Sequence, residues 1–358
     1  MNTPSRVARQ LTTSLYHHSD GLTLYATDAE TGVADLPDAS VDCLVTSPPY
    51  WRLRDYAPYT PTGECPRCRH RPAGADHHTE AQGKQRRCRD CGAWGDHPQI
   101  GLEPTAQDYI ARLRGVFAAA RRVLTPRATV WVNLGDSYST NSDGYRCTQP
   151  GQAGQPRYRP RADVPHKNLL GLPWRVALAL QDDGWILRSA IVWHKPHTTP
   201  TPIRDRLATR HEMLFLFVTH PDYHFDLDPI RQPYTGDRAL SRRAHHGGNK
   251  PHTVRGTWPR TPAHARRGRN PGNVWTIPPD RSRAGHPAPS PLEIPRRCIA
   301  AGCPDGGHVL DPFSGSGTTG LAARRLGRRF TGIDTNPRYH RLALRRLGVA
   351  GGRPRPGC

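Results

Sequence analysis

The feature that most constrains the fold is a regular alternation near the C-terminus. Residues 307–348 read GHVLDPFSGSGTTGLAARRLGRRFTGIDTNPRYHRLALRRLG. The order is an apolar run, a glycine-rich turn, a helical stretch, a second apolar run, an acidic turn and a second helical stretch. Strands joined through helices lie parallel, because the connection must return the chain to the same end of the sheet. The segment therefore predicts an α/β fold with a mostly parallel, twisted sheet.

The rest of the chain carries further elements of the same kind. Thr105 is a candidate N-cap, and Asp108 gives a weaker form of the capping box. Ile110, Leu113 and Phe117 then recur at helical spacing, and Pro126 is predicted to end this helix. Residues 22–29 are predicted to form a short strand that ends in an acidic turn. Further strands are predicted for residues 41–50, 128–136, 185–196 and 212–220, and another helix for residues 169–184.

Length and hydropathy indicate a large domain that neither crosses a membrane nor carries a secretory signal. The 358 residues are enough for a large domain with a well-buried core. No apolar run reaches the ~18 residues that a membrane helix needs, so no membrane contact is expected. The first residues lack the apolar region of a secretory signal, so a cytoplasmic location is expected.

The net charge of +21 favours a polyanionic partner such as nucleic acid. Lysine occurs only at positions 84, 167, 195 and 250, so nearly all of the positive charge is arginine. A GC-rich coding sequence would also enrich arginine, alanine, glycine and proline. The charge alone therefore leaves both explanations open.

Several stretches break the α/β pattern and suggest the domain organisation. Residues 57–100 have the composition of an inserted module, and residues 139–166 that of a mobile loop. Residues 231–273 form a basic, weakly ordered segment. The predicted catalytic domain comprises residues 1–56, 101–230 and 274–348, followed by a flexible tail at 349–358.

The insertion contains two paired cysteine units, CPRC and CRDC. Their spacing is C-x2-C-x19-C-x2-C, which is typical of a structural zinc site with four thiolate ligands in a cytosolic chain. The sequence therefore predicts a zinc-ribbon-like module. Its predicted metal ligands are Cys65, Cys68, Cys88 and Cys91.

The glycine-rich turn DPFSGSGTTG, at 311–320, is a candidate ligand site. Gly315 and Gly317 allow the backbone to turn sharply and approach a ligand. The turn lacks the lysine of a phosphate-binding P-loop and the third glycine of a dinucleotide fingerprint. The next predicted strand ends in Asp334, where an acidic group suits a ribose hydroxyl pair. A nucleoside-like cofactor is predicted.

A second unusual stretch, TSPPYW at 46–51, ends a predicted buried strand. Together with the glycine-rich turn, it resembles the amino-methylating DNA methyltransferases, which transfer a methyl group from S-adenosylmethionine to an exocyclic amine of cytosine or adenine. The resemblance covers most of the chain. Further matching segments are TDA, GLEPT, WVNLGDSY, IVWHKP, GNVWTIP and HPAPSP.

The resemblance implies a Rossmann-like methyltransferase fold in the circularly permuted order called β. In this order the catalytic motif precedes the cofactor turn, and the target-recognition region, here 231–273, lies between them. It implies Ser47, Pro48, Pro49 and Tyr50 as the catalytic tetrapeptide. The implied cofactor-binding residues are Asp28, Ser290, Asp311, Phe313, Gly315, Gly317 and Asp334; the family often has lysine where Ser290 stands.

The chemistry of the tetrapeptide follows from the weakness of the nucleophile. An exocyclic amine is a poor nucleophile, because its lone pair is delocalised into the ring. The hydroxyl of Ser47 and the carbonyl of Pro48, which Pro49 holds rigid, would accept its hydrogens. Tyr50 would stack on a base that has been flipped out of the duplex. Cys43 and Cys298 are expected in the core, without a chemical role.

Serine at the first position favours N4 of cytosine, and N6 of adenine is the alternative. The expected partner is double-stranded DNA, contacted through the arginines of residues 231–273. A non-catalytic zinc-containing DNA-binding protein and an RNA methyltransferase are further alternatives. A cognate restriction endonuclease would fit such an enzyme, which would act as a monomer or homodimer.

Overall fold

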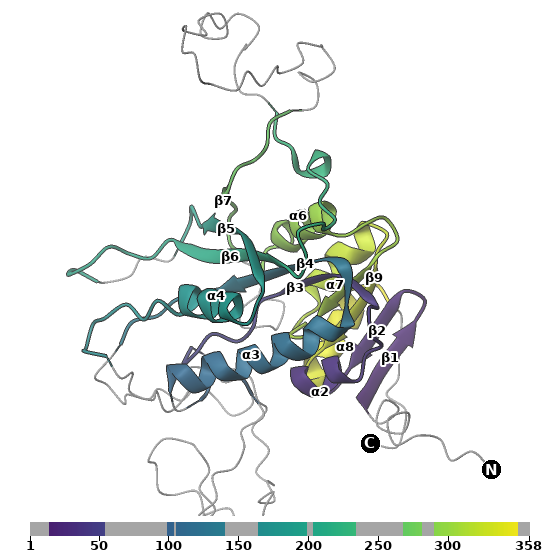
Figure 1. Cartoon of the computed structure of the whole chain (residues 1–358), viewed down its shortest axis with the longest axis horizontal. Helices are drawn as coiled ribbons and strands as arrows, with labels where there is room; N and C mark the ends of the chain where they lie inside the picture. The colour runs from purple at the N-terminus through teal and green to yellow at the C-terminus, as the bar shows by residue number, and fades with distance from the viewer. Residues whose placement is uncertain are drawn as a thin grey trace, which may run out of the picture.

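The computed structural model describes residues 14–53, 99–103, 105–139, 164–198, 203–233, 268–280 and 290–349. Within them, a nine-stranded sheet forms the middle layer of the molecule (Figure 1). The strands are β1 (Leu15–Ser19), β2 (Leu22–Tyr25), β3 (Val41–Thr46), β4 (Leu124–Leu134), β5 (Ile186–His194), β6 (His211–Val218), β7 (Val274–Thr276), β8 (His308–Asp311) and β9 (Arg329–Ile333).

Helices connect these strands and cover the sheet. They are α2 (Ala29–Ala34), α3 (Ala106–Val123), α4 (Leu172–Asp182), α6 (Glu293–Gly302), α7 (Thr318–Arg325) and α8 (Pro337–Arg346), with a short 3-10 helix η1 (Asp228–Ile230). The predicted cap of α3 is confirmed: Thr105 Oγ1 accepts a hydrogen bond of 3.1 Å from the Asp108 N–H.

The strand order is β1-β2-β9-β8-β3-β4-β6-β5-β7. The strands β2, β9, β8, β3 and β4 are parallel to one another, whereas β6 runs antiparallel to both β4 and β5. The predicted α/β fold with a mostly parallel sheet is confirmed. The C-terminal strands β8 and β9 lie between β2 and β3, which come from the N-terminal end of the chain.

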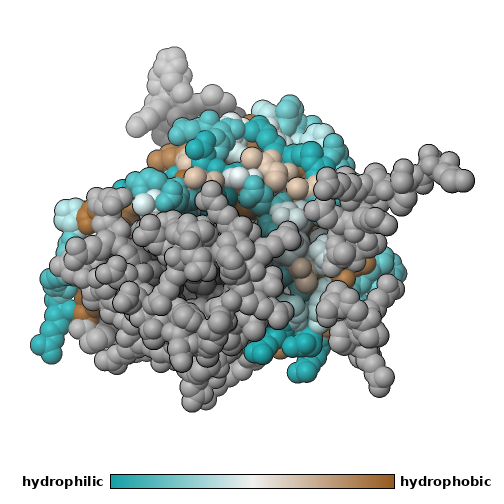
Figure 2. All heavy atoms as spheres, turned by 90° about the horizontal axis from the view of Figure 1, so that it is seen from below, coloured by the Kyte–Doolittle hydropathy of each residue, from teal (hydrophilic) through white to brown (hydrophobic). Residues whose placement is uncertain are grey.

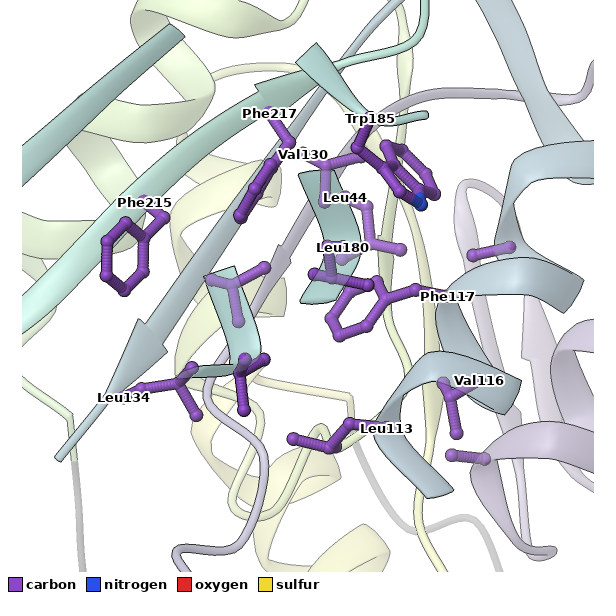
Figure 3. Close-up of a cluster of buried hydrophobic side chains, with 14 of the residues drawn as sticks. Leu44, Leu113, Val116, Phe117, Val130, Leu134, Leu180, Trp185, Phe215 and Phe217 are labelled. Carbon is purple, nitrogen blue, oxygen red and sulfur yellow. The ribbon is translucent and has the colours of Figure 1, made fainter. Parts of the chain in front are cut away.

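Two hydrophobic cores lie on the two faces of the sheet. On one face α2, α3 and α4 pack, and Phe117 and Leu113 of α3 point toward Leu44 and Val130 of the sheet (Figure 3). On the other face α6, α7 and α8 contribute a second cluster. Cys43 and Cys298 are fully buried in this second cluster, as predicted.

The boundary between α3 and β4 differs from the prediction. The helix α3 ends at Val123, and Pro126 lies within β4 instead of ending the helix. The pairing between β3 and β4 is irregular between Val41 and Cys43, opposite this proline. A residue without a backbone N–H is tolerated at such an irregularity, because no ladder hydrogen bond is required there.

Residues 22–29 were predicted as a short strand that ends in an acidic turn. The strand β2 ends at Tyr25, and Asp28 caps the short helix α2. A helix of six residues is too short to show helical periodicity, so the sequence did not reveal it. The edge strands β1 and β7 and the helix α6 were also not predicted.

The remaining predicted segments lie largely outside the described residues. These are the inserted module with all four predicted zinc ligands, the loop at 139–166, most of the basic segment and the C-terminal tail. Within the described ranges, no group of three or more His, Cys, Asp or Glu side chains could hold a metal ion. No described helix is long and apolar enough to cross a membrane. Most of the described surface is hydrophilic in the view of Figure 2.

Candidate active site

A cavity of about 380 Å³ lies where the parallel strands end. Carboxyl ends of parallel strands meet at one edge of a sheet, which is the usual position of a ligand site in open α/β folds. Ser47 follows β3, Asp311 ends β8 and Asp334 follows β9. The predicted site residues that line this cavity are Asp28, Ser47, Pro48, Pro49, Tyr50, Ser290, Asp311, Phe313, Gly315 and Asp334.

Gly317 is the exception among the predicted residues, because it is not among those that line the cavity. It occupies the N-cap of α7 with φ of 74°. A Cβ at this position would lie 2.7 Å from the Cβ of Ala343 in α8. Gly317 therefore allows α7 and α8 to pack closely, which is a different reason for a glycine than the predicted approach to a ligand.

The glycine-rich turn is joined to the end of β9 by hydrogen bonds. The Gly315 N–H donates to Oδ2 of Asp334 at 2.9 Å, and the Asn336 N–H donates to Oδ1 at 2.7 Å. Gly315 has φ of 48°, a conformation that glycine adopts without strain. The carboxylate of Asp334 is thereby fixed at the cavity wall.

Asp311 connects the two predicted motifs. Its Oδ1 accepts hydrogen bonds from the Thr46 hydroxyl at 2.7 Å and from the Phe313 N–H at 3.0 Å. Its Oδ2 accepts a hydrogen bond of 2.7 Å from the Thr319 hydroxyl. The carboxylate therefore ties the end of β3 to the turn after β8 and to the start of α7.

Asp311 is buried and Asp334 is half-buried at the cavity wall, and both carboxyl groups have a raised pKa. Burial raises the pKa of Asp311 to about 6 and the pKa of Asp334 to about 7. In the part of the chain that the structure describes, the hydrogen bonds to both come only from hydroxyl and backbone N–H groups. A cationic ligand with hydroxyl donors would compensate such groups, so the donor set fits a ribose-bearing sulfonium.

The other two side chains of the predicted cofactor set that can form hydrogen bonds are Asp28 and Ser290. Oδ1 of Asp28 accepts the Thr31 N–H at 2.9 Å and so caps α2. Ser290 lines the cavity just before α6. Asp28 thus has a structural task besides its position at the cavity.

The predicted catalytic tetrapeptide, residues 47–50, lies in the same cavity, next to a polar cluster. The Tyr50 hydroxyl lies 2.7 Å from Oε2 of Glu212 and 3.0 Å from Oδ1 of Asn133. The Ser47 hydroxyl lies 3.4 Å from both the Tyr50 hydroxyl and Oδ1 of Asn133. Glu212 also forms an ion pair with Lys195.

Hydrogen bonds from Tyr109 and Trp51 hold the backbone around the tetrapeptide in place. The Tyr109 hydroxyl of α3 donates to the Pro49 carbonyl at 3.0 Å. Trp51 is 1% exposed, and its Nε1 donates to the Glu103 carbonyl at 2.9 Å. Trp51 belongs to the core and is not among the residues that line the cavity. Trp51 therefore anchors the end of the tetrapeptide in the core.

Asn133, Lys195 and Glu212 were not predicted as site residues. They lie at the end of β4, just after β5 and at the start of β6, all at the same edge of the sheet as Ser47. WVNLGDSY and IVWHKP were recognised as matching segments, but nothing in their local pattern assigns a role to Asn133 or Lys195. Only the pairing of β4, β5 and β6 brings these side chains together.

The sequence profile of a family described as DNA methylase matches residues 41–345, which include both motifs and the cavity between them. The chain belongs to this family. The resemblance expected from TSPPY and FSGSG is therefore confirmed.

Several relatives of this DNA methylase are type II methyltransferases. It is 36% identical over 330 residues to M.XycI of Xanthomonas campestris pv. cyanopsidis, covering 91% of this chain and 88% of the relative. It is 33% identical to M.SmaI of Serratia marcescens, covering 89% and 88%.

Solved structures share the fold of this DNA methylase at low sequence identity. The PvuII DNA methyltransferase (cytosine-N4-specific) superposes with a TM-score of 0.56 at 16% identity, covering 91% of this chain and 86% of that one. A putative DNA modification methylase from Thermus thermophilus, complexed with S-adenosyl-L-methionine, gives 0.51 at 22% identity, covering 92% and 94%.

Proposed function

We propose that this protein transfers a methyl group from S-adenosylmethionine to the N4 amine of a flipped-out cytosine in duplex DNA. The observation that carries the proposal is that one cavity brings Ser47 and Tyr50 together with Asp334 and the glycine-rich turn. The proposed sites for an amine and for a nucleoside cofactor would therefore be adjacent, as direct transfer requires.

The two carboxylates provide the cofactor half of the site. S-adenosylmethionine would supply an electrophilic methyl group on a positively charged sulfur. Asp334, with both oxygens fixed by backbone N–H groups, would accept the ribose hydroxyls. Asp311 would add negative charge beside the turn, and Phe313 would pack against the cofactor. Gly315, Asp28 and Ser290 would complete the binding surface.

The catalytic half would hold and orient the amine. The Ser47 hydroxyl and the Pro48 carbonyl would accept the amine hydrogens, which turns the nitrogen lone pair toward the methyl group. Pro49 restricts the backbone of Pro48, and its own carbonyl is held by Tyr109. The ring of Tyr50 would stack on the flipped base, an interaction worth roughly 1–3 kcal/mol.

Cytosine N4 is preferred to adenine N6 because serine occupies the first position of the tetrapeptide. The cytosine-N4 specificity named for the PvuII enzyme, which shares the fold, agrees with this choice. Methylation of adenine N6 by the same site is the second candidate, because the family includes both activities.

We further propose that the order of motifs is a circular permutation. The position of β8 and β9 between β2 and β3 supports this, because the cofactor turn at the end of the sequence thereby returns to the middle of the sheet. Residues 231–273 would then form the target-recognition region. The four cysteines Cys65, Cys68, Cys88 and Cys91 would bind a structural zinc ion in the inserted module.

Cellular context follows from a DNA substrate. The type II relatives support a role in a restriction–modification system with a cognate endonuclease. The protein would act in the cytoplasm, in association with DNA, as a monomer or homodimer. A non-catalytic DNA-binding role would need no cavity that joins the two motifs, so we favour the enzyme.

The test is to incubate the protein with plasmid DNA and methyl-labelled S-adenosylmethionine, hydrolyse the DNA and identify the modified base. We expect N4-methylcytosine from the wild type and no label from Ser47→Ala with Tyr50→Ala. N6-methyladenine would establish the second candidate, and an unlabelled product would favour the binding-only role.

The zinc proposal has a separate test. Purified wild-type protein should contain one equivalent of zinc per chain by elemental analysis, and the Cys65→Ser and Cys88→Ser variants should lose it. Full zinc content in both variants would contradict the four-cysteine site.

A further inference from the structure

We infer that Glu212 and Lys195 form a positioning pair that fixes the orientation of Tyr50 for the target base. The inference deepens the proposed function and rests on it, since that function makes Tyr50 the stacking partner of the base. Neither residue was assigned a role from the sequence. The pair acts through Tyr50 and does not itself need to contact the substrate.

The sheet places the two charges side by side. Glu212 is the second residue of β6, and its cross-strand neighbour is Trp193 of β5. Lys195 follows β5 and pairs with Oε1 of Glu212. The two side chains, Lys195 and Glu212, are only 20% and 15% exposed, so the pair is largely shielded from water.

Lys195 has a second contact that limits its movement. Its Nζ lies 4.3 Å from the ring centroid of Trp193, within the range of a cation–π interaction. The ammonium is therefore held between an aromatic face and a carboxylate. A shielded ion pair with an additional contact is better defined in geometry than an exposed one.

Glu212, held by Lys195, in turn fixes the position of the Tyr50 hydroxyl. Its second oxygen, Oε2, accepts the hydrogen bond from the Tyr50 hydroxyl at 2.7 Å. A hydrogen bond to a charged acceptor is about twice as strong as one between neutral groups. Because Lys195 binds the other oxygen, the carboxylate is held between the ammonium and the phenol.

The ring of Tyr50 is also constrained along its edge. A Cβ on Gly135 would lie 2.5 Å from Cε2 of Tyr50, so the ring packs directly on this glycine backbone. One contact holds the hydroxyl and the other holds the ring carbons, and together they define the plane in which a base can stack. The same hydroxyl lies 3.4 Å from the Ser47 hydroxyl, so its position also affects the predicted amine acceptor.

The test compares single and double variants of the full-length protein in steady-state methylation of a duplex oligonucleotide that contains the target site. We expect Glu212→Leu and Tyr50→Phe each to lower kcat by roughly tenfold or more, because each removes the same charged hydrogen bond. The double variant should be faster than the product of the two single effects predicts, since the two changes share the hydrogen bond between Tyr50 and Glu212.

Conservative variants separate positioning from general structure. Glu212→Gln retains an acceptor for the Tyr50 hydroxyl, so it should recover part of the lost kcat. Lys195→Arg should remain close to wild type, whereas Lys195→Met should resemble Glu212→Leu. The Kd for S-adenosylmethionine should stay unchanged in all of them, because the cofactor lies against the other half of the cavity.

The matched control is Asp183→Asn. It breaks the ion pair of 2.5 Å between Asp183 and Arg114, which joins the end of α4 to α3 outside the cavity. This variant should keep the wild-type kcat. If Glu212→Leu does not fold, Lys195→Met combined with Tyr50→Phe provides the same test of coupling.

The outcomes distinguish this inference from the proposed function. An active wild type with additive effects of Glu212→Leu and Tyr50→Phe, or a folded Glu212→Leu variant with wild-type kcat, would overturn the positioning pair alone. A wild type that transfers no methyl group would overturn the proposed function and the pair together.

Discussion

Two glycines leave room for Tyr50 at the wall of the cavity. Gly135 at the end of β4 leaves room for the ring of Tyr50, and Gly101, with φ of 100°, passes close to the Tyr50 carbonyl. A side chain at either position would clash with Tyr50 or Pro49 of the predicted catalytic tetrapeptide. The sequence shows both glycines, but it does not show that they face the same tyrosine.

Gly135→Ala is therefore expected to reduce methylation without unfolding the protein. The new Cβ would lie 2.5 Å from Cε2 of Tyr50, well inside contact distance, so the ring must move. We expect kcat to fall by about tenfold or more, the usual size of effect when a reacting group is misplaced. Thermal unfolding should change little, and Gly115→Ala in α3 is the control, because its φ is not positive and the nearest atom outside its own helix backbone, Oε1 of Glu30, would lie 3.4 Å from the new Cβ. Wild-type activity of Gly135→Ala would show that Tyr50 does not need its present position.

The raised pKa values of Asp311 and Asp334 predict how cofactor binding depends on pH. Burial raises the pKa of Asp311 from 3.8 to about 6 and that of Asp334 from 3.8 to about 7. A cationic cofactor with hydroxyl donors needs both groups ionised, so binding must release protons below these values. We expect affinity for S-adenosylmethionine to rise between about pH 5.5 and about pH 7.5, by up to about tenfold per unit for one group, and then to level off.

Calorimetry in two buffers of different ionisation enthalpy would measure the released protons. His340, whose pKa burial lowers from 6.5 to about 4, stays neutral over this pH range and does not obscure the signal. The stability of the cofactor-free protein should depend on pH in the opposite direction to cofactor affinity. The raised pKa values of the two carboxyl groups stabilise the fold below pH 3.8, and this contribution to the free energy of unfolding is lost as the pH rises through about 6 to 7. An affinity independent of pH would contradict the assignment of Asp311 and Asp334.

At the scale of elements, the glycine-rich turn depends on the packing of the helices behind it. The turn ends at Gly317, the N-cap of α7, where α8 approaches so closely that a Cβ would meet Ala343 at 2.7 Å. Arg346 of α8 also donates to the Ser316 carbonyl at 2.9 Å. The helix α8 therefore holds the turn in place.

Gly317→Ala tests this arrangement. Both the φ of 74° and the contact with Ala343 oppose a side chain, so α7 must shift away from α8 and carry the turn with it. We expect a loss of about 1–3 kcal/mol in the free energy of unfolding, measured in urea, and weaker cofactor binding. Gly327→Ala, at φ of 69° with open space around it, is the control for the backbone effect alone. Equal stability of the two variants would contradict the packing role.

At the scale of the whole molecule, the net charge of +21 predicts how the protein binds DNA. Contacts to phosphates release condensed counterions, so affinity should fall steeply and linearly on a logarithmic scale as salt increases. Binding of a fluorescent duplex between about 50 and about 200 mM salt would measure the slope. Cofactor affinity over the same range is the internal control and should change far less. A flat response for DNA would indicate that the charge reflects coding bias.

Prediction from the sequence succeeded where the signal is local. The cap at Thr105, the helix after the glycine-rich turn and the strand before TSPPYW depend on neighbours within a few residues. It failed for β1, β7 and α2, which are short elements held by the sheet and by packing and not by their own periodicity. Gly317 stays a predicted cofactor residue, but the sequence did not show its close contact with Ala343, because that residue lies in another helix.

The sequence by itself determined the class of fold, the two motifs and the identity of the groups they present. These properties follow from side-chain chemistry and from turns within a few residues. Only the tertiary structure decided that Thr46 bonds to Asp311, 265 residues away, and that Lys195 and Glu212 join Tyr50 in one cavity. Strand order in a parallel sheet is set by non-local pairing and packing, which no local pattern records.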